Sequence, residues 1–276
     1  AAERFCIGAK TGSSAGGGML VDSHCHLQML KEASSQGGVR AALQLAKTEG
    51  VERMLCIACC EEDFAKVLGY AKAFEEVEAC VGLHPCSANT QSASLLSILE
   101  GFAGLEEVVA LGETGLDYYH ETALNKSRQQ AHFVDHMALS SRFSKPLVVH
   151  TRNSSQDAIA MLHDEAKPDV TGVFHCFVES YEVAKRILDL GFYVSFSGIL
   201  TFKNAGALRE VTQKLPKDRV LVETDSPYLG PVPMRGKENQ PAYVSHVARV
   251  LAELWAMPYE AVCARTTQNY QELFHA

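Results

Sequence analysis

Short apolar runs alternate with longer segments of mixed polarity along almost the whole chain. The first apolar run covers 19–21, and further strands are expected at 53–60, 79–83, 107–111, 146–149, 172–174, 192–196 and 219–222. Short apolar runs bounded by turn residues are typical of strands that are buried in a sheet. Apolar residues recur with helical spacing between these runs, and helices are expected at 33–48, 62–74, 94–102, 126–143, 158–165, 182–190, 204–215, 241–255 and 259–274.

Strands and helices therefore alternate in eight units, with no linker between them. Such alternation predicts βαβ units and a parallel sheet. No glycine fingerprint GxGxxG follows the first strand, which argues against a dinucleotide-binding open sheet. We expect an α/β fold, a closed (β/α)8 TIM barrel, as one hydrolase domain over 19–276. Residues 1–18 contain the run Ser13–Gly18 and are expected to be a flexible N-terminal extension.

The composition and net charge of the chain argue against several classes of function. The chain has 276 residues, of which 47% are hydrophobic, enough for one large core. A net charge of -8 argues against avid, non-specific binding to duplex nucleic acid, while a small positive site stays possible. No stretch is long enough to span a membrane. The nine cysteines lie mostly in apolar runs, which indicates reduced thiols and a cytoplasmic protein.

Metal-ligating side chains gather at the ends of the expected strands. His24 and His26 are two residues apart at the end of the first strand, so their imidazoles leave it on the same side. Strand ends four, five, six and eight add Glu113, His150, His175 and Asp225. In a barrel the carboxyl ends of all strands form one face, where catalysis takes place in this fold. We therefore expect one metal centre at this face.

Six ligands are too many for a single catalytic zinc, which keeps an open coordination position. They suit two ions that share a carboxylate, and Glu113 is the expected bridge because it has two oxygens. His24, His26 and Asp225 would hold one ion, and His150 and His175 the other. Four imidazoles favour zinc, nickel, iron or manganese over magnesium. The CxxC at Cys56 and Cys59 has no second pair, so no four-thiolate zinc site is expected.

Several long strings resemble one family. DSHCHL, GLHP, ALGETGLDYY, VVHTR, FHCF, LDLGFYVSFSGI, VETDSPYL and RGKENQPAYV occur in this order between 20 and 274. They are similar to the TatD family of metal-dependent deoxyribonucleases in the amidohydrolase superfamily, in particular to its bacterial cytoplasmic YcfH-type members. The resemblance implies a TIM barrel, two divalent cations (zinc, manganese, magnesium or nickel) and hydrolysis of phosphodiester bonds in DNA. The family's metal positions fall on the six residues above.

The expected reaction is attack by an activated water on a phosphodiester, as in an exonuclease on single-stranded DNA. Glu113 and Asp225 would be the catalytic carboxylates, with Asp225 able to take the proton of the water. Arg152 lies two residues beyond His150, on the same side of that strand, and is a candidate phosphate clamp. Further candidates for substrate contact follow strands three, seven and eight: His84, Lys203, Arg235 and Lys237.

Two other functions stay open from the sequence. The first is an ester or amide hydrolase on the same scaffold, for instance an aminoacyl-tRNA deacylase. Many relatives in the superfamily bridge their metals with a modified lysine, whereas the fourth strand here offers Glu113. The second is a metal-stabilised barrel without catalysis. Six candidate ligands at one face of the barrel argue against it, because structural zinc sites are closed and four-coordinate. No obligate protein partner is expected.

Overall fold

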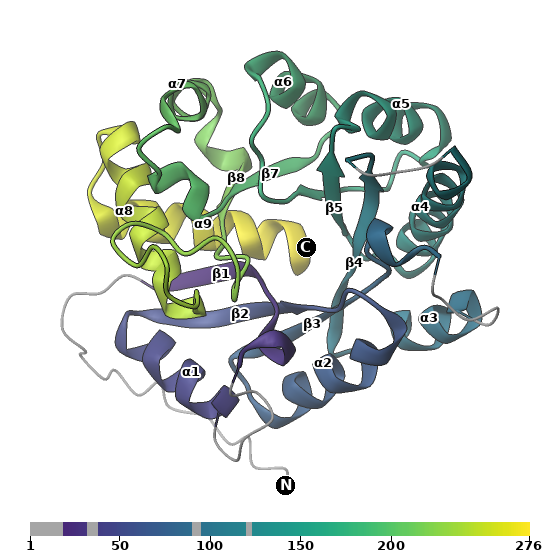
Figure 1. Cartoon of the computed structure of the whole chain (residues 1–276), viewed down its shortest axis with the longest axis horizontal. Coiled ribbons are helices and arrows are strands. Elements are labelled where there is room, and N and C mark those ends of the chain that lie inside the picture. Colours follow the sequence, from purple (N-terminus) through teal and green to yellow (C-terminus); the bar gives the residue numbers. More distant parts are fainter. Residues whose placement is uncertain (1–18, 32–37, 90–94, 120–122) are drawn as a thin grey trace, which may run out of the picture.

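Eight parallel strands form one sheet in which each strand pairs with the next along the chain. The computed structural model describes residues 19–31, 38–89, 95–119 and 123–276. The strands are β1 (Leu20–Cys25), β2 (Val51–Ile57), β3 (Val77–Val81), β4 (Val108–Asp117), β5 (Leu147–Arg152), β6 (Gly172–Phe174), β7 (Tyr193–Phe196) and β8 (Val220–Val222). The expected α/β fold and barrel architecture are confirmed (Figure 1).

The sheet closes between β1 and the segment that follows β8. Cys25 and Ser226 form an isolated parallel bridge, and the amide of His26 donates to the carbonyl of Ser226 at 2.8 Å. Below it, the buried carboxyl of Asp22 accepts hydrogen bonds from the amide and the hydroxyl of Thr224, at 2.9 and 2.6 Å. These contacts bring His24 and His26, the first candidate metal ligands of the chain, beside Asp225, the last.

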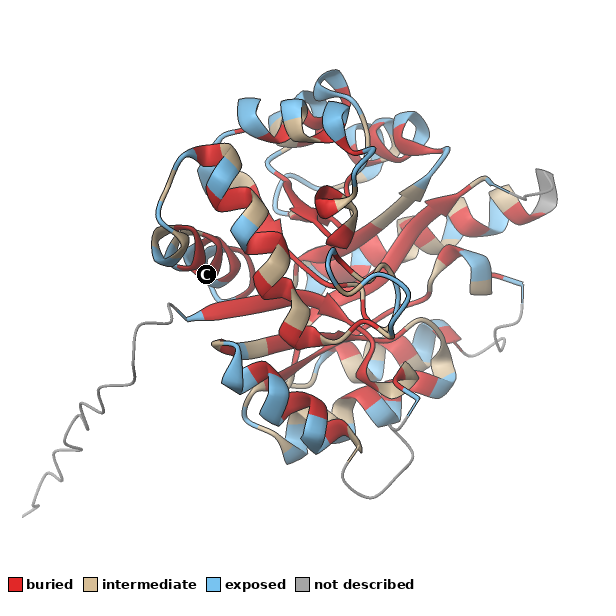
Figure 2. Ribbon diagram, turned by 60° about the vertical axis from the view of Figure 1, so that its left-hand side comes forward, coloured by how far each residue is buried: buried red, intermediate tan, exposed pale blue. Residues whose placement is uncertain are grey.

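Helices surround the strands and turn their apolar sides inward. They are α1 (Gly38–Thr48), α2 (Glu61–Ala73), α3 (Leu95–Ala103), α4 (Ala123–Phe143), α5 (Ser155–Glu165), α6 (Tyr181–Asp189), α7 (Gly206–Lys214), α8 (Val244–Trp255) and α9 (Tyr259–Phe274). Short 3-10 turns lie at Leu27–Met29, Pro85–Ser87, Gly198–Thr201, Lys217–Arg219 and Pro241–Tyr243. In Figure 2 the strands are mostly buried, while exposed residues lie on the outer sides of the helices.

The interior of the barrel is apolar and is closed at one end by the last helix. Inward-facing residues from all eight strands, such as Val21 and Val148, cluster with Tyr270, Leu273 and Phe274 of α9. The hydroxyl of Tyr270 donates to the buried carboxylate of Glu78 at 2.5 Å. The strands' amino ends are thus filled, which leaves their carboxyl ends as the face that can receive a ligand.

Two strands extend further than the sequence predicted. The expected fourth and fifth strands ended at 111 and 149, whereas β4 runs to Asp117 and β5 to Arg152. Gly115 pairs with His150 in this extension, and a Cβ on Gly115 would lie 2.2 Å from the carbonyl oxygen of His150. The glycines of this segment allow the close approach of β5. Glu113, His150 and Arg152 therefore lie inside strands.

Three of the sequence predictions fall wholly or partly on residues outside the described ranges. These are the flexible extension at 1–18, the first residues of the helix expected from 33, and the first residue of the helix expected from 94. Among the described residues, no helix is both long and apolar enough to cross a membrane.

Candidate metal centre

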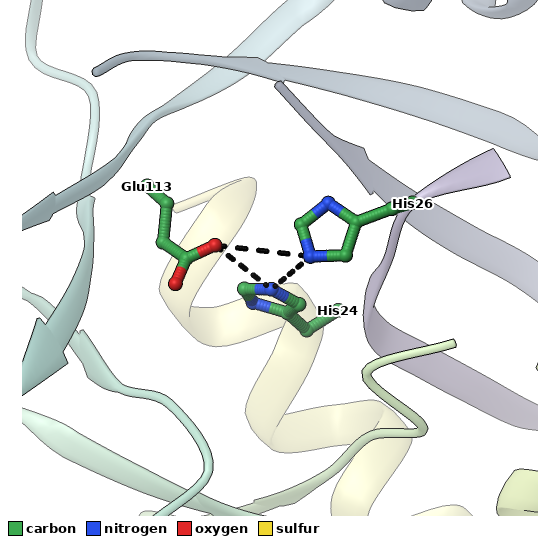
Figure 3. Close-up of side chains that lie close together, drawn as sticks. All are labelled: His24, His26 and Glu113. Carbon is green, nitrogen blue, oxygen red and sulfur yellow. Dashed lines mark hydrogen bonds and ion pairs between the residues drawn. The ribbon is translucent and has the colours of Figure 1, made fainter. Parts of the chain in front are cut away.

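The carboxylate of Glu113 lies between two sets of imidazoles. Its Oε2 is 3.5 Å from Nε2 of His24 and 3.8 Å from Nε2 of His26. Its Oε1 is 2.7 Å from Nε2 of His175 and 3.0 Å from Nδ1 of His150. Figure 3 shows one of the two oxygens directed at both His24 and His26. Each oxygen of Glu113 thus faces its own pair of histidines.

Asp225 completes the first set. Its Oδ1 lies 3.5 Å from Nε2 of His24 and 3.3 Å from Nε2 of His26, and these two ring nitrogens are 3.2 Å apart. The backbone fixes the arrangement, because the amide of Asp225 donates to the carbonyl of His24 at 2.9 Å. The structure therefore brings together His24, His26, Asp225 and one oxygen of Glu113, the group expected around one ion.

His150 and His175 form the second set. Nδ1 of His150 lies 3.3 Å from Nε2 of His175, and both nitrogens face the same oxygen of Glu113. The ring of His175 also stacks on that of His24, with centroids 3.9 Å apart and planes inclined by 8°. The two sets are therefore adjacent and share Glu113 and this stacked pair.

In three of the histidines, the ring nitrogen that points away from Glu113 and Asp225 donates a hydrogen bond. This bond fixes the direction of the other ring nitrogen. Nδ1 of His26 donates to the carbonyl of Ile57 at 2.9 Å, and Nε2 of His150 donates to Asp117 at 2.9 Å. Nδ1 of His175 donates to Glu223 at 3.3 Å. In a neutral imidazole the second nitrogen then carries a lone pair, which is the arrangement that a metal ligand requires.

The donor set fits divalent cations. Lone pairs of His26, His150 and His175 face carboxylate oxygens within 4 Å, which is repulsive unless positive charge lies between them. Protons can supply that charge: burial alone would lower the pKa of His175, yet Glu113 and Glu223 raise that pKa well above its ordinary value. A cation at these positions would replace the protons and bind the same nitrogen and oxygen atoms.

Two carboxylates of this centre were not among the residues predicted from the sequence. Asp117 and Glu223 each accept a hydrogen bond from a histidine that is a candidate metal ligand, and Ser195 donates in turn to Glu223. Such outer partners fix the ring orientation of a metal-binding histidine. Glu223 could have been found, because it stands two residues before Asp225. Asp117 lies beyond residue 111, where the fourth strand was expected to end, so strand periodicity did not place it beside His150.

A cavity of about 600 Å³ opens over this centre. Arg152 and His84 line it, as expected, and the guanidinium of Arg152 lies 3.7 Å from the ring centre of Tyr119. Three other candidates for substrate contact are exposed and do not line the cavity: Lys203, Arg235 and Lys237. Arg235 instead lies 3.8 Å from the ring centre of Phe202. Contact of these three with a longer substrate stays a prediction.

His84 faces the centre as a hydrogen-bond donor. Its Nδ1 accepts from the amide of Cys86 at 3.1 Å, so its proton is on Nε2, which lies 3.4 Å from Oε1 of Glu113. Burial lowers the pKa of His84 to about 4, although Glu113 opposes that change. The ring is therefore neutral at neutral pH and presents an N–H to any anion that approaches Glu113.

The two cysteines of the CxxC lie in different surroundings. Cys56 is buried and its thiol donates to Gln28 Oε1 at 3.4 Å. Cys59 lines the cavity, with its sulfur 3.6 Å from Nδ1 of His26 and 3.9 Å from Oε2 of Glu113. Both are free thiols.

Comparisons with known proteins agree with this fold and show the family of the chain. The family described as TatD related DNase matches residues 21–275. YcfH of Escherichia coli K12, named a metal-dependent hydrolase, is 44% identical over 93% of this chain and 96% of its own length. YabD of Bacillus subtilis, named likewise, is 35% identical over 93% of this chain and 99% of its own. The crystal structure of YjjV, a TatD homologue from E. coli, has 30% identity and a TM-score of 0.87, covering 93% of this chain and 98% of that one.

Proposed function

Because the chain belongs to the TatD family of metal-dependent hydrolases, we propose that it cleaves phosphodiester bonds in DNA, from the end of a single strand. One observation carries the proposal: each oxygen of Glu113 faces a different pair of imidazoles. A carboxylate in this position suits two divalent cations better than one. When bound, such ions would neutralise charge on the phosphate and lower the pKa of water.

Asp225 is the proposed general base. Burial alone would raise its pKa, but His26, His24 and His175 together hold that pKa below its ordinary value. The carboxylate is therefore ionised at neutral pH. It lines the cavity beside Glu113, where it can accept the proton of an attacking water.

Two other residues are proposed to hold the phosphate. Arg152 lines the cavity, and its guanidinium can form two parallel hydrogen bonds to phosphate oxygens. His84 adds the Nε2–H described above. Both would act on the non-bridging oxygens, whose negative charge increases as the attacking oxygen approaches phosphorus. The opening of about 600 Å³ has the size of a small-molecule site, which favours a strand end over a long duplex segment.

The test is a time course on end-labelled single-stranded DNA with magnesium, manganese or zinc, and with EDTA as a control. We expect metal-dependent shortening from one end, which would also give the polarity. The variant Glu113→Gln should lose about 10³-fold in kcat, as when a group that stabilises transition-state charge is removed. Glu253→Gln, an exposed position on α8, is the matched control and should keep full activity.

DNA that stays intact with every metal would overturn the proposal. Cleavage of an aminoacyl-tRNA ester under the same conditions would then favour the ester hydrolase alternative. A loss of thermal stability with unchanged turnover in Glu113→Gln would favour a structural metal. Metal analysis of protein purified without added ions would identify the cation.

A further inference from the structure

The cavity over the metal centre has two chemically different walls. One wall is polar and includes Thr151 and Arg152 of β5 together with His84 and Ser87. The other is apolar and follows strands β1, β6, β7 and β8: Met29, Val178, Ile199, Tyr228 and Leu229. We call these five residues the apolar wall. The proposed phosphate contacts use only the polar wall, so the apolar wall has no role in the reaction as described so far.

Two members of the apolar wall are unusually exposed for their type. The exposed fraction is 55% for Tyr228 and 53% for Val178. Large exposed apolar side chains beside a cavity mark binding sites, because they gain by being covered. The ring centre of Tyr228 lies 6.4 Å from that of His26, one of the proposed ligands. Whatever covers Tyr228 therefore lies next to the reacting phosphate.

The exposed ring of Tyr228 stands on a fixed backbone. The side chain of the buried Asn239 donates to the carbonyl of Tyr228 at 2.6 Å and to that of Thr224 at 2.9 Å. The amide of Tyr228 donates to the carbonyl of Asp225 at 2.9 Å. A backbone held in this way positions the ring before a ligand arrives, which lowers the entropy lost on binding.

We propose that the apolar wall binds the nucleobase next to the scissile phosphate, with Tyr228 stacked on its face. The inference rests on the proposed nuclease function. It assigns the base of the substrate to the apolar wall and the phosphate to the polar wall. A nucleotide unites a flat apolar face with an anion, and the cavity unites the apolar wall with Arg152 and His84 on the opposite side. An acyl chain would use the apolar wall but would leave these anion-binding groups unused.

The proposal also predicts little sequence preference. Apart from Tyr228, the apolar wall consists of Met, Val, Ile and Leu, which carry no strong hydrogen-bonding group to read a base edge. Base–aromatic stacking tolerates all four bases because each has a π-face. The side chain of Tyr228 is itself engaged, since its hydroxyl points to the sulfur of Met29 at 3.7 Å.

The test compares dinucleotides with and without each base. Wild type and variants are assayed on three substrates: thymidylyl-thymidine, and the two analogues in which one of the two nucleosides is abasic. Tyr228→Ala should lower kcat/KM about 5- to 150-fold for substrates that keep the stacked base, the range expected for one base–aromatic stack. The same substitution should change kcat/KM little for the analogue that lacks that base. The analogue that is unaffected therefore identifies on which side of the scissile phosphate the base is stacked.

Two variants serve as controls. Tyr228→Phe keeps the ring and should retain activity close to wild type. Tyr181→Ala removes an exposed tyrosine on α6 that does not line the cavity, and should leave all three rates unchanged. Thermal unfolding of each variant verifies that the fold is intact.

An equal fall of kcat/KM on all three substrates, or no fall on any, would overturn the stacking site while the nuclease function stands. A Tyr228→Phe variant as slow as Tyr228→Ala would assign the effect to the hydroxyl and would also overturn it. If wild type cleaves none of the dinucleotides and no single-stranded DNA, the proposed function itself fails, and the base site with it.

Discussion

The carboxylate of Asp117 accepts a hydrogen bond from Nε2 of His150 at 2.9 Å, and this bond directs Nδ1 of the same ring toward Glu113. Burial alone would raise the pKa of Asp117, but the bonds from His150 and from the amide of Tyr119 lower it to about 2. The carboxylate is therefore ionised throughout the physiological range and holds the proton of His150 on the outer nitrogen.

Replacing Asp117 by Asn should weaken metal binding by about 10- to 100-fold, the usual effect of losing an outer partner of a ligand histidine. The physical reason is that a neutral amide no longer fixes the proton on Nε2 of His150. Competition with a chromophoric chelator measures the affinity. Asp164→Asn is the matched control, because Asp164 also contacts a histidine, His163, at 2.7 Å but on the exposed surface. Unchanged affinity in Asp117→Asn would contradict the prediction.

Gly198 should not tolerate a side chain. A Cβ there would lie 2.1 Å from the carbonyl oxygen of Leu229, in the segment that carries Tyr228. Gly198→Ala must displace that segment, and we expect a loss of about 1–3 kcal/mol in the free energy of unfolding. Gly69→Ala in α2 is the control: no atom lies within 4 Å, and removing a helical glycine should stabilise by about 0.5–1 kcal/mol. Urea unfolding compares the two, and equal stability of both variants would refute this account.

His136 should make the metal-free protein less stable in acid. It is buried in α4, its Nε2 accepts from the amide of Leu83 at 3.2 Å, and burial lowers its pKa to about 4 from 6.5. Above pH 6.5 the ring is neutral in both the folded and the unfolded chain. As the pH falls toward 4, only the unfolded chain takes up the proton, so up to about 3 kcal/mol of stability is lost.

The variant His136→Gln should remove this part of the pH dependence while keeping an acceptor for Leu83. Urea unfolding in EDTA at about pH 7.5 and about pH 5, on either side of the ordinary histidine pKa, measures the difference. His163→Gln, at an exposed position of α5, should keep the full wild-type dependence. If His136→Gln loses as much stability in acid as wild type does, other groups carry the effect.

Tyr270 should matter for stability and not for chemistry. Its hydroxyl donates to Glu78 at the amino ends of the strands, opposite the metal centre, and the ring is fully buried. Tyr270→Phe leaves one acceptor of Glu78 without this donor, which should cost about 1–3 kcal/mol. Activity below the melting temperature should stay as in wild type, because this end of a barrel serves stability. Thermal unfolding and the DNA time course test both parts, with the exposed Tyr181→Phe as control.

Much of the centre follows from local patterns in the sequence. The alternation of side chains along a strand places His24 and His26 on one side, and the structure has their Nε2 atoms 3.2 Å apart. The same rule places Arg152 with His150 at the cavity. The alternation of strands and helices was sufficient to predict the barrel, and a barrel puts all carboxyl ends on one face.

Tertiary structure decided which groups orient the ligands and where the strands end. His150 meets Asp117 across 33 residues, and His175 meets Glu223 across 48. Glycines 112 and 115 lie beyond residue 111, where the fourth strand was expected to end, but in the barrel they belong to β4 and allow β5 to approach it closely. Hydrophobic periodicity reports only the faces of one element, whereas distances between side chains of different strands depend on how those strands pair and tilt around the barrel. The six candidate ligands could therefore be predicted from the sequence, whereas their outer partners Asp117 and Glu223 and the geometry of the centre could not.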